Sequence, residues 1–149
     1  MGLTSCSMTD SSAVPIPEAN FTEPTVLVTL TGPDRKGVST RLFGALARHG
    51  VEVVDVEQLV VRGRLILSTL VTQPTEQTAF DQDLRRVASE CDMELSIEAG
   101  HGDNRPRRIG RAQVTLLGAP LVPAAVAAVA EGITELGGNI DRILRLARY

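Results

Sequence analysis

Aromatic residues are scarce in this sequence of 149 residues: they make up 3% of it, with one Tyr and no Trp. Proteins that bind single-stranded nucleic acid stack the bases on aromatic side chains, so this scarcity argues against that function. The net charge of −3 also removes a general attraction to phosphate backbones. We therefore expect no nucleic acid partner, and we expect a core built from Val, Leu, Ile and Ala.

Cysteine and long apolar runs are also rare or missing. Cys6 and Cys91 are too few for a disulfide framework or a zinc site. No apolar run approaches the roughly 18 residues of a membrane span. The first 24 residues contain neither Lys nor Arg, unlike a secretory signal peptide. These absences predict a cytoplasmic protein with no membrane partner and no metal site.

Lysine is limited to Lys36, whereas arginine supplies the other 14 basic residues. Residues 1–100 carry a net charge of −6, and residues 101–149 carry +3. Four arginines gather between positions 105 and 111, beside Gly and Pro. We interpret this stretch as part of a solvated linker, with a phosphate- or partner-binding patch as the alternative.

Alternating and helical hydrophobic patterns divide the chain. Residues 1–24, rich in Ser, Thr and Pro, are predicted to form a flexible leader. We expect strands over 26–30, 51–61, 64–71 and 93–99, with a bend near 53–54 where the alternation slips. Helices are expected over 36–48 and about 75–92. This βαββαβ order predicts an α+β, ferredoxin-like domain over residues 25–100, with both helices on one face of a four-stranded antiparallel sheet.

The same pattern begins again after a linker at 101–111. A-Q-V-T-L-L-G at 112–118 repeats T-V-L-V-T-L-T-G at 25–32, and Gly32 and Gly118 are 86 residues apart. A strand over 112–118, a helix over 122–136 and a strand over 139–148 are expected. Residues 112–149 are thus interpreted as the first half of a second unit. A half unit leaves an open sheet edge, so we expect a fragment of a longer protein or completion by another chain.

The segment T-G-P-D-R-K-G at 31–37 links the first strand to the first helix. The N–H groups at a helix N-terminus favour an anion such as a ligand carboxylate. Gly32 and Gly37 would let a small molecule approach the backbone, and Asp34 offers a carboxylate to an ammonium group. Together they suit both ends of an amino acid. The alternative is that Asp34 caps the helix.

Two strings carry a family resemblance: V-L-V-T-L-T-G-P-D-R-K-G-V at 26–38 and H-G-V-E-V-V-D-V-E-Q at 49–58. Together they resemble an ACT domain, a small regulatory module that binds amino acids, often at interfaces between two copies. The tandem arrangement, with N-I-D-R-I-L-R-L-A-R-Y at 139–149, is similar to the N-terminal region of actinobacterial phosphoserine phosphatases. In those proteins two ACT units precede a phosphatase domain of the haloacid dehalogenase type. The resemblance covers residues 25–149.

That resemblance implies regulation by L-serine, the end product of serine biosynthesis, in a homodimer formed through the ACT sheets. The matching site positions are Asp34, Gly37, Val38, Gly118 and Asn139. The second loop, G-A-P-L-V, lacks the acid and the second glycine, and Glu52 stands at the first unit's equivalent of Asn139. These departures favour a composite site between the first loop of one chain and the second unit of another.

Two other functions stay open. One is a dimer or interaction module in which the ACT sheets pair without a ligand. The other is an ACT unit of a different enzyme or regulator, such as a formyltetrahydrofolate deformylase or a glycine-cleavage regulator. Serine binding would separate the first of these from the leading interpretation.

No catalytic set can be assembled from this chain. The phosphatase class named above needs an Asp-x-Asp pair at the end of an apolar strand, with Mg²⁺ to neutralise the phosphate. Asp81 and Asp83 have that spacing but fall on a predicted amphipathic helix, where a solvated helix face is the simpler interpretation. We expect no catalytic residue and no cofactor here, with Mg²⁺ confined to the presumed catalytic domain of a parent phosphatase.

Overall fold

The structure is a computed structural model that describes residues 23–102 and 112–145. The chain divides into two compact units, residues 1–106 and 107–149. The predicted leader up to residue 22, with Cys6, lies outside the described residues, as do the arginine cluster at 105–111 and residues 146–149.

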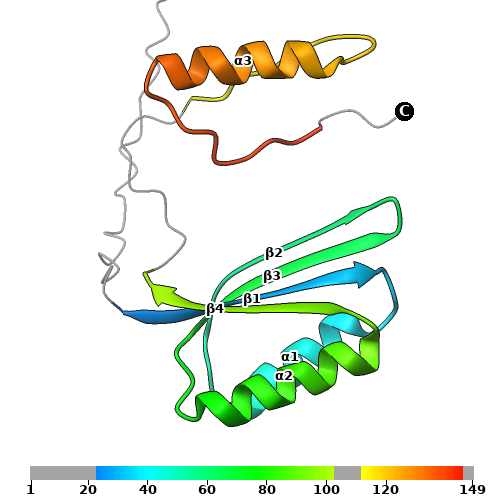
Figure 1. Ribbon diagram of the computed structural model, residues 1–149, viewed down its shortest axis with the longest axis vertical. Helices are drawn as coiled ribbons and strands as arrows, with labels where there is room; N and C mark the ends of the chain where they lie inside the picture. Colours follow the sequence, from blue (N-terminus) through cyan, green and yellow to red (C-terminus); the bar gives the residue numbers. More distant parts are fainter. Residues whose placement is uncertain (1–22, 103–111, 146–149) are drawn as a thin grey trace, which may run out of the picture. The chain divides into compact units, whose positions relative to one another are not determined.

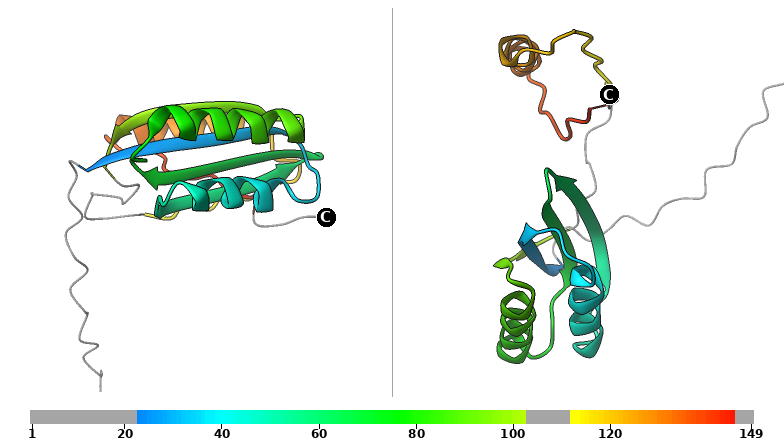
Figure 2. Two further views of the ribbon diagram at one scale, coloured as in Figure 1. Left: turned by 90° about the horizontal axis from the view of Figure 1, so that it is seen from below. Right: turned by 90° about the vertical axis from the view of Figure 1, so that its right-hand side faces the viewer.

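The first unit has the predicted βαββαβ order. Its elements are β1 (Pro24–Pro33), α1 (Val38–Arg48), β2 (Val53–Val61), β3 (Arg64–Thr72), α2 (Gln77–Cys91) and β4 (Glu94–His101). The sheet order is β2-β3-β1-β4, and every neighbouring pair is antiparallel. The ferredoxin-like fold class is therefore confirmed, with both helices on one face of the sheet (Figures 1 and 2).

The core lies between that face and the two helices. Alternate residues of β1 and β3 point into it, and the predicted apolar faces of α1 and α2 are buried against them. The core includes Val26, Val28, Leu30, Leu65, Leu67 and Val71 from the strands, and Val38, Leu42, Ala45, Leu46, Phe80, Leu84, Val87, Ala88 and Cys91 from the helices. Thr69 is also fully buried on β3, and its hydroxyl has no hydrogen-bond partner among the described residues.

The strands β2 and β3 form a hairpin closed by Arg62 and Gly63. Both residues have positive φ, 50° and 74°, as a two-residue turn of type I′ requires. The register of β2 on β3 shifts between Val53 and Asp55, which confirms the predicted irregularity near residues 53–54.

The two edges of the sheet differ in character. β2 exposes Val53, Val56, Val60 and Val61, with 39–61% of each residue accessible. β4, at the other edge, exposes Glu94, Ser96 and Glu98. Charged residues discourage a new strand from pairing with an edge, whereas exposed β-branched residues do not. β2 also carries the acids Asp55 and Glu57, so its exposed valines, and not a lack of acidic residues, distinguish this edge from β4.

The second unit differs from the prediction. Its helix is present as α3 (Pro123–Glu135), but residues 112–118 and 139–145 form no strand. The first unit explains why. There, β2 pairs only with β3, and β1 lies between β3 and β4, so β1 and β2 never touch. Among the described residues after β4 there is no strand that could act as a second β3 or β4, so the two segments have no pairing partner in this part of the structure. No described helix is long and apolar enough to cross a bilayer.

Candidate ligand-binding loop

The loop between β1 and α1 is fastened to the neighbouring hairpin. The Asp34 N–H donates a hydrogen bond to the Gly63 carbonyl oxygen at 2.8 Å. This contact follows from the register, in which Pro33 lies opposite Arg64. The loop is therefore held at the end of the sheet, next to the hairpin turn.

Asp34 does not cap helix α1. The N-cap residue is Gly37, with φ 89° and no side-chain hydrogen bond to the first turn. The capping alternative is therefore wrong. The Asp34 side chain is exposed, and no hydrogen bond or ion pair joins its carboxylate to any residue that the structure describes. A carboxylate in this state is available to an ammonium group.

The two loop glycines have different roles. Gly32 is buried, and a methyl group there would lie 2.5 Å from Met93 Sδ and 3.1 Å from the Asp92 carbonyl oxygen. Its lack of a side chain thus serves packing against the start of β4. Gly37 faces open space, because a Cβ atom added to it would have no neighbouring atom within 4 Å. Of the pair, only Gly37 leaves room for a ligand.

Val38 offers a ligand its backbone alone. The residue is 2% exposed, and its side chain belongs to the core. Its N–H is the first of α1, and the N–H groups at the start of a helix lack intrahelical partners. The first turn of α1 contains no acidic residue and is therefore compatible with a bound carboxylate.

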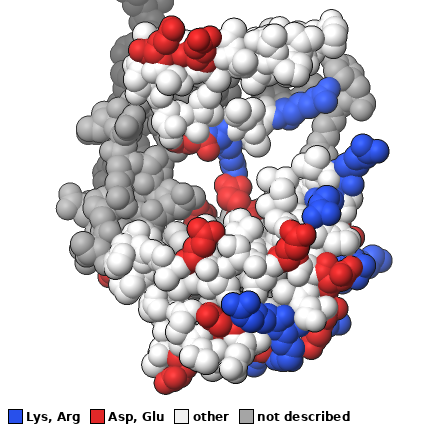
Figure 3. Space-filling view, viewed as in Figure 1, with Lys and Arg blue, Asp and Glu red and all other residues white. Residues whose placement is uncertain are grey.

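Basic side chains surround the loop, a feature that the predictions from sequence missed. Arg35 pairs with Asp92 at 3.1 Å, on the β4 side. Lys36, Arg62 and Arg64 are exposed and make no ion pair with a described residue. Figure 3 shows basic side chains gathered toward the end of the unit where Figure 1 places this loop and the β2–β3 turn. The β1–β3 register brings residues 63 and 64 beside residues 33 and 34, and the sequence alone did not reveal this register.

Gly118 and Asn139 lie in the second unit. Both are exposed, and they precede and follow helix α3. The structure brings Asp34, Gly37 and Val38 together in one loop, whereas the composite site that would add these two residues stays a prediction.

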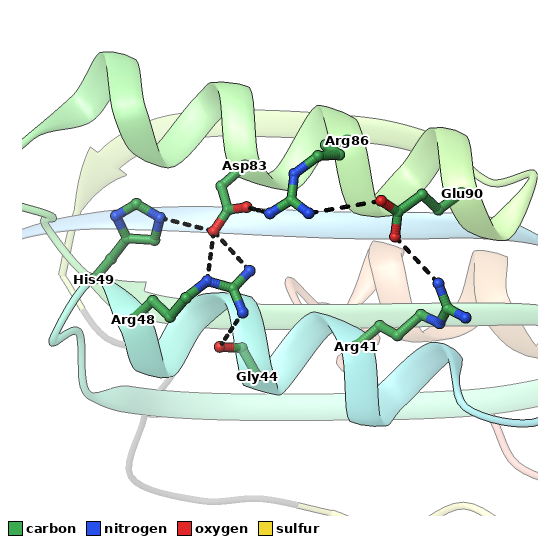
Figure 4. Close-up of polar contacts among 7 residues, drawn as sticks. All are labelled: Arg41, Gly44, Arg48, His49, Asp83, Arg86 and Glu90. Carbon is green, nitrogen blue, oxygen red and sulfur yellow. Dashed lines mark hydrogen bonds and ion pairs between the residues drawn. The ribbon is translucent and has the colours of Figure 1, made fainter.

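Asp81 and Asp83 both lie on α2, not at the end of a strand. Asp81 accepts a hydrogen bond from Gln77. The Asp83 carboxylate, 13% exposed, accepts hydrogen bonds from Arg48 at 2.8 and 3.0 Å, from His49 at 3.2 Å and from Arg86 (Figure 4). This aspartate therefore fastens the C-terminus of α1 to α2.

The environment of Asp83 shifts its titration. Burial by itself would raise the pKa of Asp83, but the hydrogen bonds from Arg48, Arg86 and His49 outweigh it and hold the pKa below the ordinary value. The His49 ring also lies edge-on to the buried Phe80 ring, with centroids 5.4 Å apart. We therefore interpret the cluster as a structural one that stabilises the packing of α1 against α2.

A shallow hollow of about 350 Å³ lies on the sheet face opposite the helices. It is lined by residues that include Thr25, Ser68, Leu70, Glu98 and His101. These residues lie toward the start of β1 and the end of β4, away from the β1–α1 loop. The hollow contains none of the predicted site residues.

The model of the ACT domain family matches residues 24–98. Among curated proteins, the phosphoserine phosphatase of Streptomyces coelicolor is 49% identical over 130 residues, which cover 85% of this chain and 31% of that protein. The phosphoserine phosphatase SerB2 of Mycobacterium tuberculosis is 40% identical over 129 residues, with 83% and 31% covered. The chain thus spans about a third of the length of these relatives.

A solved structure supports the fold. A putative glycine cleavage system transcriptional repressor superposes with a TM-score of 0.51 at 15% identity, covering 56% of this chain and 49% of its own. An ACT domain protein from Streptococcus pneumoniae gives a TM-score of 0.46 at 16% identity, covering 52% and 90%.

Proposed function

Because this chain belongs to the ACT domain family, we propose that it is an amino-acid-binding regulatory region of a phosphoserine phosphatase of serine biosynthesis, with L-serine as the ligand. The chain itself supplies no catalytic residue in this proposal. Regulation of the enzyme by the end product is the role that such a region would perform, and the Mg²⁺-dependent chemistry would belong to a separate domain.

The state of Asp34 is the observation that carries the proposal. Its carboxylate is exposed, has no partner among the described residues and is not used to cap α1. Gly37 leaves open space beside it, and the N–H groups of the first turn of α1 begin one residue later. An ammonium group at Asp34 and a carboxylate at the helix N-terminus would satisfy both ends of an amino acid.

Calorimetric titration of the chain with L-serine tests this site. We expect Asp34→Ala to weaken binding by roughly tenfold or more, since a charge-assisted hydrogen bond contributes about 1.5–3 kcal/mol. Glu76→Ala is the matched control, because Glu76 is an exposed carboxylate at the start of α2 with no side-chain cap bond. Equal affinity of Asp34→Ala and the unmodified chain would remove the site assignment.

We also propose that the chain forms a homodimer through its first sheet, at the β2 edge. β2 has β3 as its one neighbour in the sheet, and it exposes Val53, Val56, Val60 and Val61 while also carrying Asp55 and Glu57. Addition of strand to strand across such an edge supplies main-chain hydrogen bonds and buries the valines.

The competing function is a dimerisation module without a ligand. The exposed β2 edge is compatible with it, since strand pairing needs no amino acid. Thermal unfolding separates the two functions, because a ligand that binds only the folded state raises its stability by RT ln(1 + [L]/Kd). A melting temperature that does not respond to millimolar L-serine in a stable dimer would favour the module without ligand.

A further inference from the structure

The charges around the β1–α1 loop are divided unevenly between its two sides. On the β4 side, Arg35 is neutralised by Asp92, and Glu94 accepts a hydrogen bond from Thr31. On the β3 side stand Arg62 and Arg64, and the loop itself carries Lys36; all three are exposed and have no ion pair to a described residue. Strand β1 separates the two sides, because the sheet order is β2-β3-β1-β4. The acids of the β4 side therefore do not compensate the bases of the β3 side.

The backbone holds Arg62 and Arg64 beside Asp34, and Lys36 follows Asp34 by two residues in the loop. The hydrogen bond from Asp34 N–H to the Gly63 carbonyl places the loop against the turn, and Arg62 precedes that turn's glycine while Arg64 follows it. Arg64 lies opposite Pro33 in the register, one residue before Asp34. Around a molecule bound at Asp34, the described charges are the bases Arg35, Lys36, Arg62 and Arg64 and the acids Asp34, Asp92 and Glu94, which is a surplus of one positive charge.

A neutral zwitterion does not use this surplus. Its ammonium group would pair with Asp34 and its carboxylate with the first turn of α1, which leaves Lys36, Arg62 and Arg64 without a counterion. Like charges held together without a counterion repel each other, and a second anionic group on the ligand would relieve that repulsion and form charge-assisted hydrogen bonds. Arginine is well suited to bind phosphate and carboxylate with two parallel hydrogen bonds.

We propose that this loop binds an α-amino acid that carries a second anionic group, a phosphate ester or a carboxylate, more tightly than it binds L-serine, and that Lys36, Arg62 and Arg64 bind the second group. The inference rests on the proposed function, since it places the amino acid at Asp34. L-Serine lacks the second anionic group and binds the same loop more weakly than its phosphate ester does.

Calorimetry on the 149-residue chain tests the ligand class with four probes: O-phospho-L-serine, L-aspartate, L-serine and inorganic phosphate. We expect O-phospho-L-serine to bind roughly tenfold more tightly than L-serine, with an affinity that falls as salt is added. L-Aspartate distinguishes a carboxylate from a phosphate ester as the second group. Inorganic phosphate that binds as tightly as O-phospho-L-serine would overturn the amino-acid class and leave a general anion patch.

The double variant Arg62→Gln/Arg64→Gln tests the residues. It should weaken binding of O-phospho-L-serine by roughly tenfold and that of L-serine by less than about twofold. Arg85→Gln is the control, since Arg85 is exposed on α2 and has no ion pair among the described residues. Circular dichroism would establish that each variant is folded.

The outcomes separate this inference from the proposed function. Equal affinity for the two serine compounds, or an equal loss for both in the double variant, overturns the ligand class while the amino-acid site stands. Failure of every amino acid to bind overturns both.

Discussion

At the scale of single residues, Asp83 shows how a partly buried carboxylate is made stabilising. Three donors surround it, from Arg48 and His49 at the end of α1 and from Arg86 one turn along α2. Because these bonds lower the pKa of Asp83 in the folded state, folding favours the charged form. Its contribution is complete above the unfolded pKa of about 4 and is lost as the pH falls through the lower folded value.

We predict that Asp83→Asn lowers the free energy of unfolding at pH 7 by about 1 kcal/mol. The effect is modest because the arginines are exposed and the solvent screens part of their interaction with Asp83. The difference from the unmodified chain should shrink below about pH 4, where the wild-type carboxyl also becomes neutral. Urea unfolding at several pH values measures both effects.

Asp92→Asn serves as the comparison for Asp83→Asn. Its pair with Arg35 is exposed on both sides, with 54% and 73% of the side chains accessible, so we expect a change below about 0.5 kcal/mol. A loss as large as that of Asp83→Asn would contradict the role given to burial.

At the scale of elements, the spacing of hydrophobic residues correctly predicted those strands whose pairing partner lies in the same unit. The periodicity predicted all six elements of the first unit, and the helix faces it identified are buried. It predicted that α1 begins near Lys36, which is too early. The helix begins at Val38, because Gly37 has a left-handed backbone conformation. It also predicted strands at 112–118 and 139–148, since a local pattern does not show whether a neighbouring strand exists.

The loop illustrates the same limit of sequence reasoning. Composition and spacing identified Asp34 and Gly37 as available groups. They did not show that the space beside Gly32 is filled by Met93 or that Arg62 and Arg64 stand beside the loop, because both facts depend on pairing between distant strands. A site assembled across strands becomes visible only once the register is known.

The β2 edge supports a prediction about self-association at this scale. We expect Val56→Lys/Val60→Lys to weaken the proposed dimer by roughly tenfold or more, because charged side chains on an edge strand oppose pairing. Ser96→Lys on β4 is the matched control and should leave the dimer intact. Sedimentation velocity over a range of concentrations measures the change. Equal dissociation of both variants would place the interface elsewhere.

At the scale of the whole molecule, the two units are unequal in burial. The first contains the entire buried core of the described residues, whereas no residue of α3 is buried. An isolated helix of 13 residues is marginal in water. Stability therefore resides in the first unit.

Hydrogen exchange checks this division. We predict that amides of β1 and β3 exchange only through global unfolding of the first unit, while those of α3 exchange orders of magnitude faster. Mass spectrometry of peptides from the two units measures these exchange rates directly. Protection of α3 equal to that of β3 would show that the second unit gains its stability from a partner.

The strand order has a consequence for the timing of synthesis. β1 and β2 are both made before residue 62, yet neither has a neighbour in the sheet until β3 (Arg64–Thr72) follows. A ribosome that adds about 5–20 residues per second would thus complete β1, α1 and β2 before the first strand pair can close. In this fold β1 and β2 are made first, and they cannot form a sheet until β3 has been added.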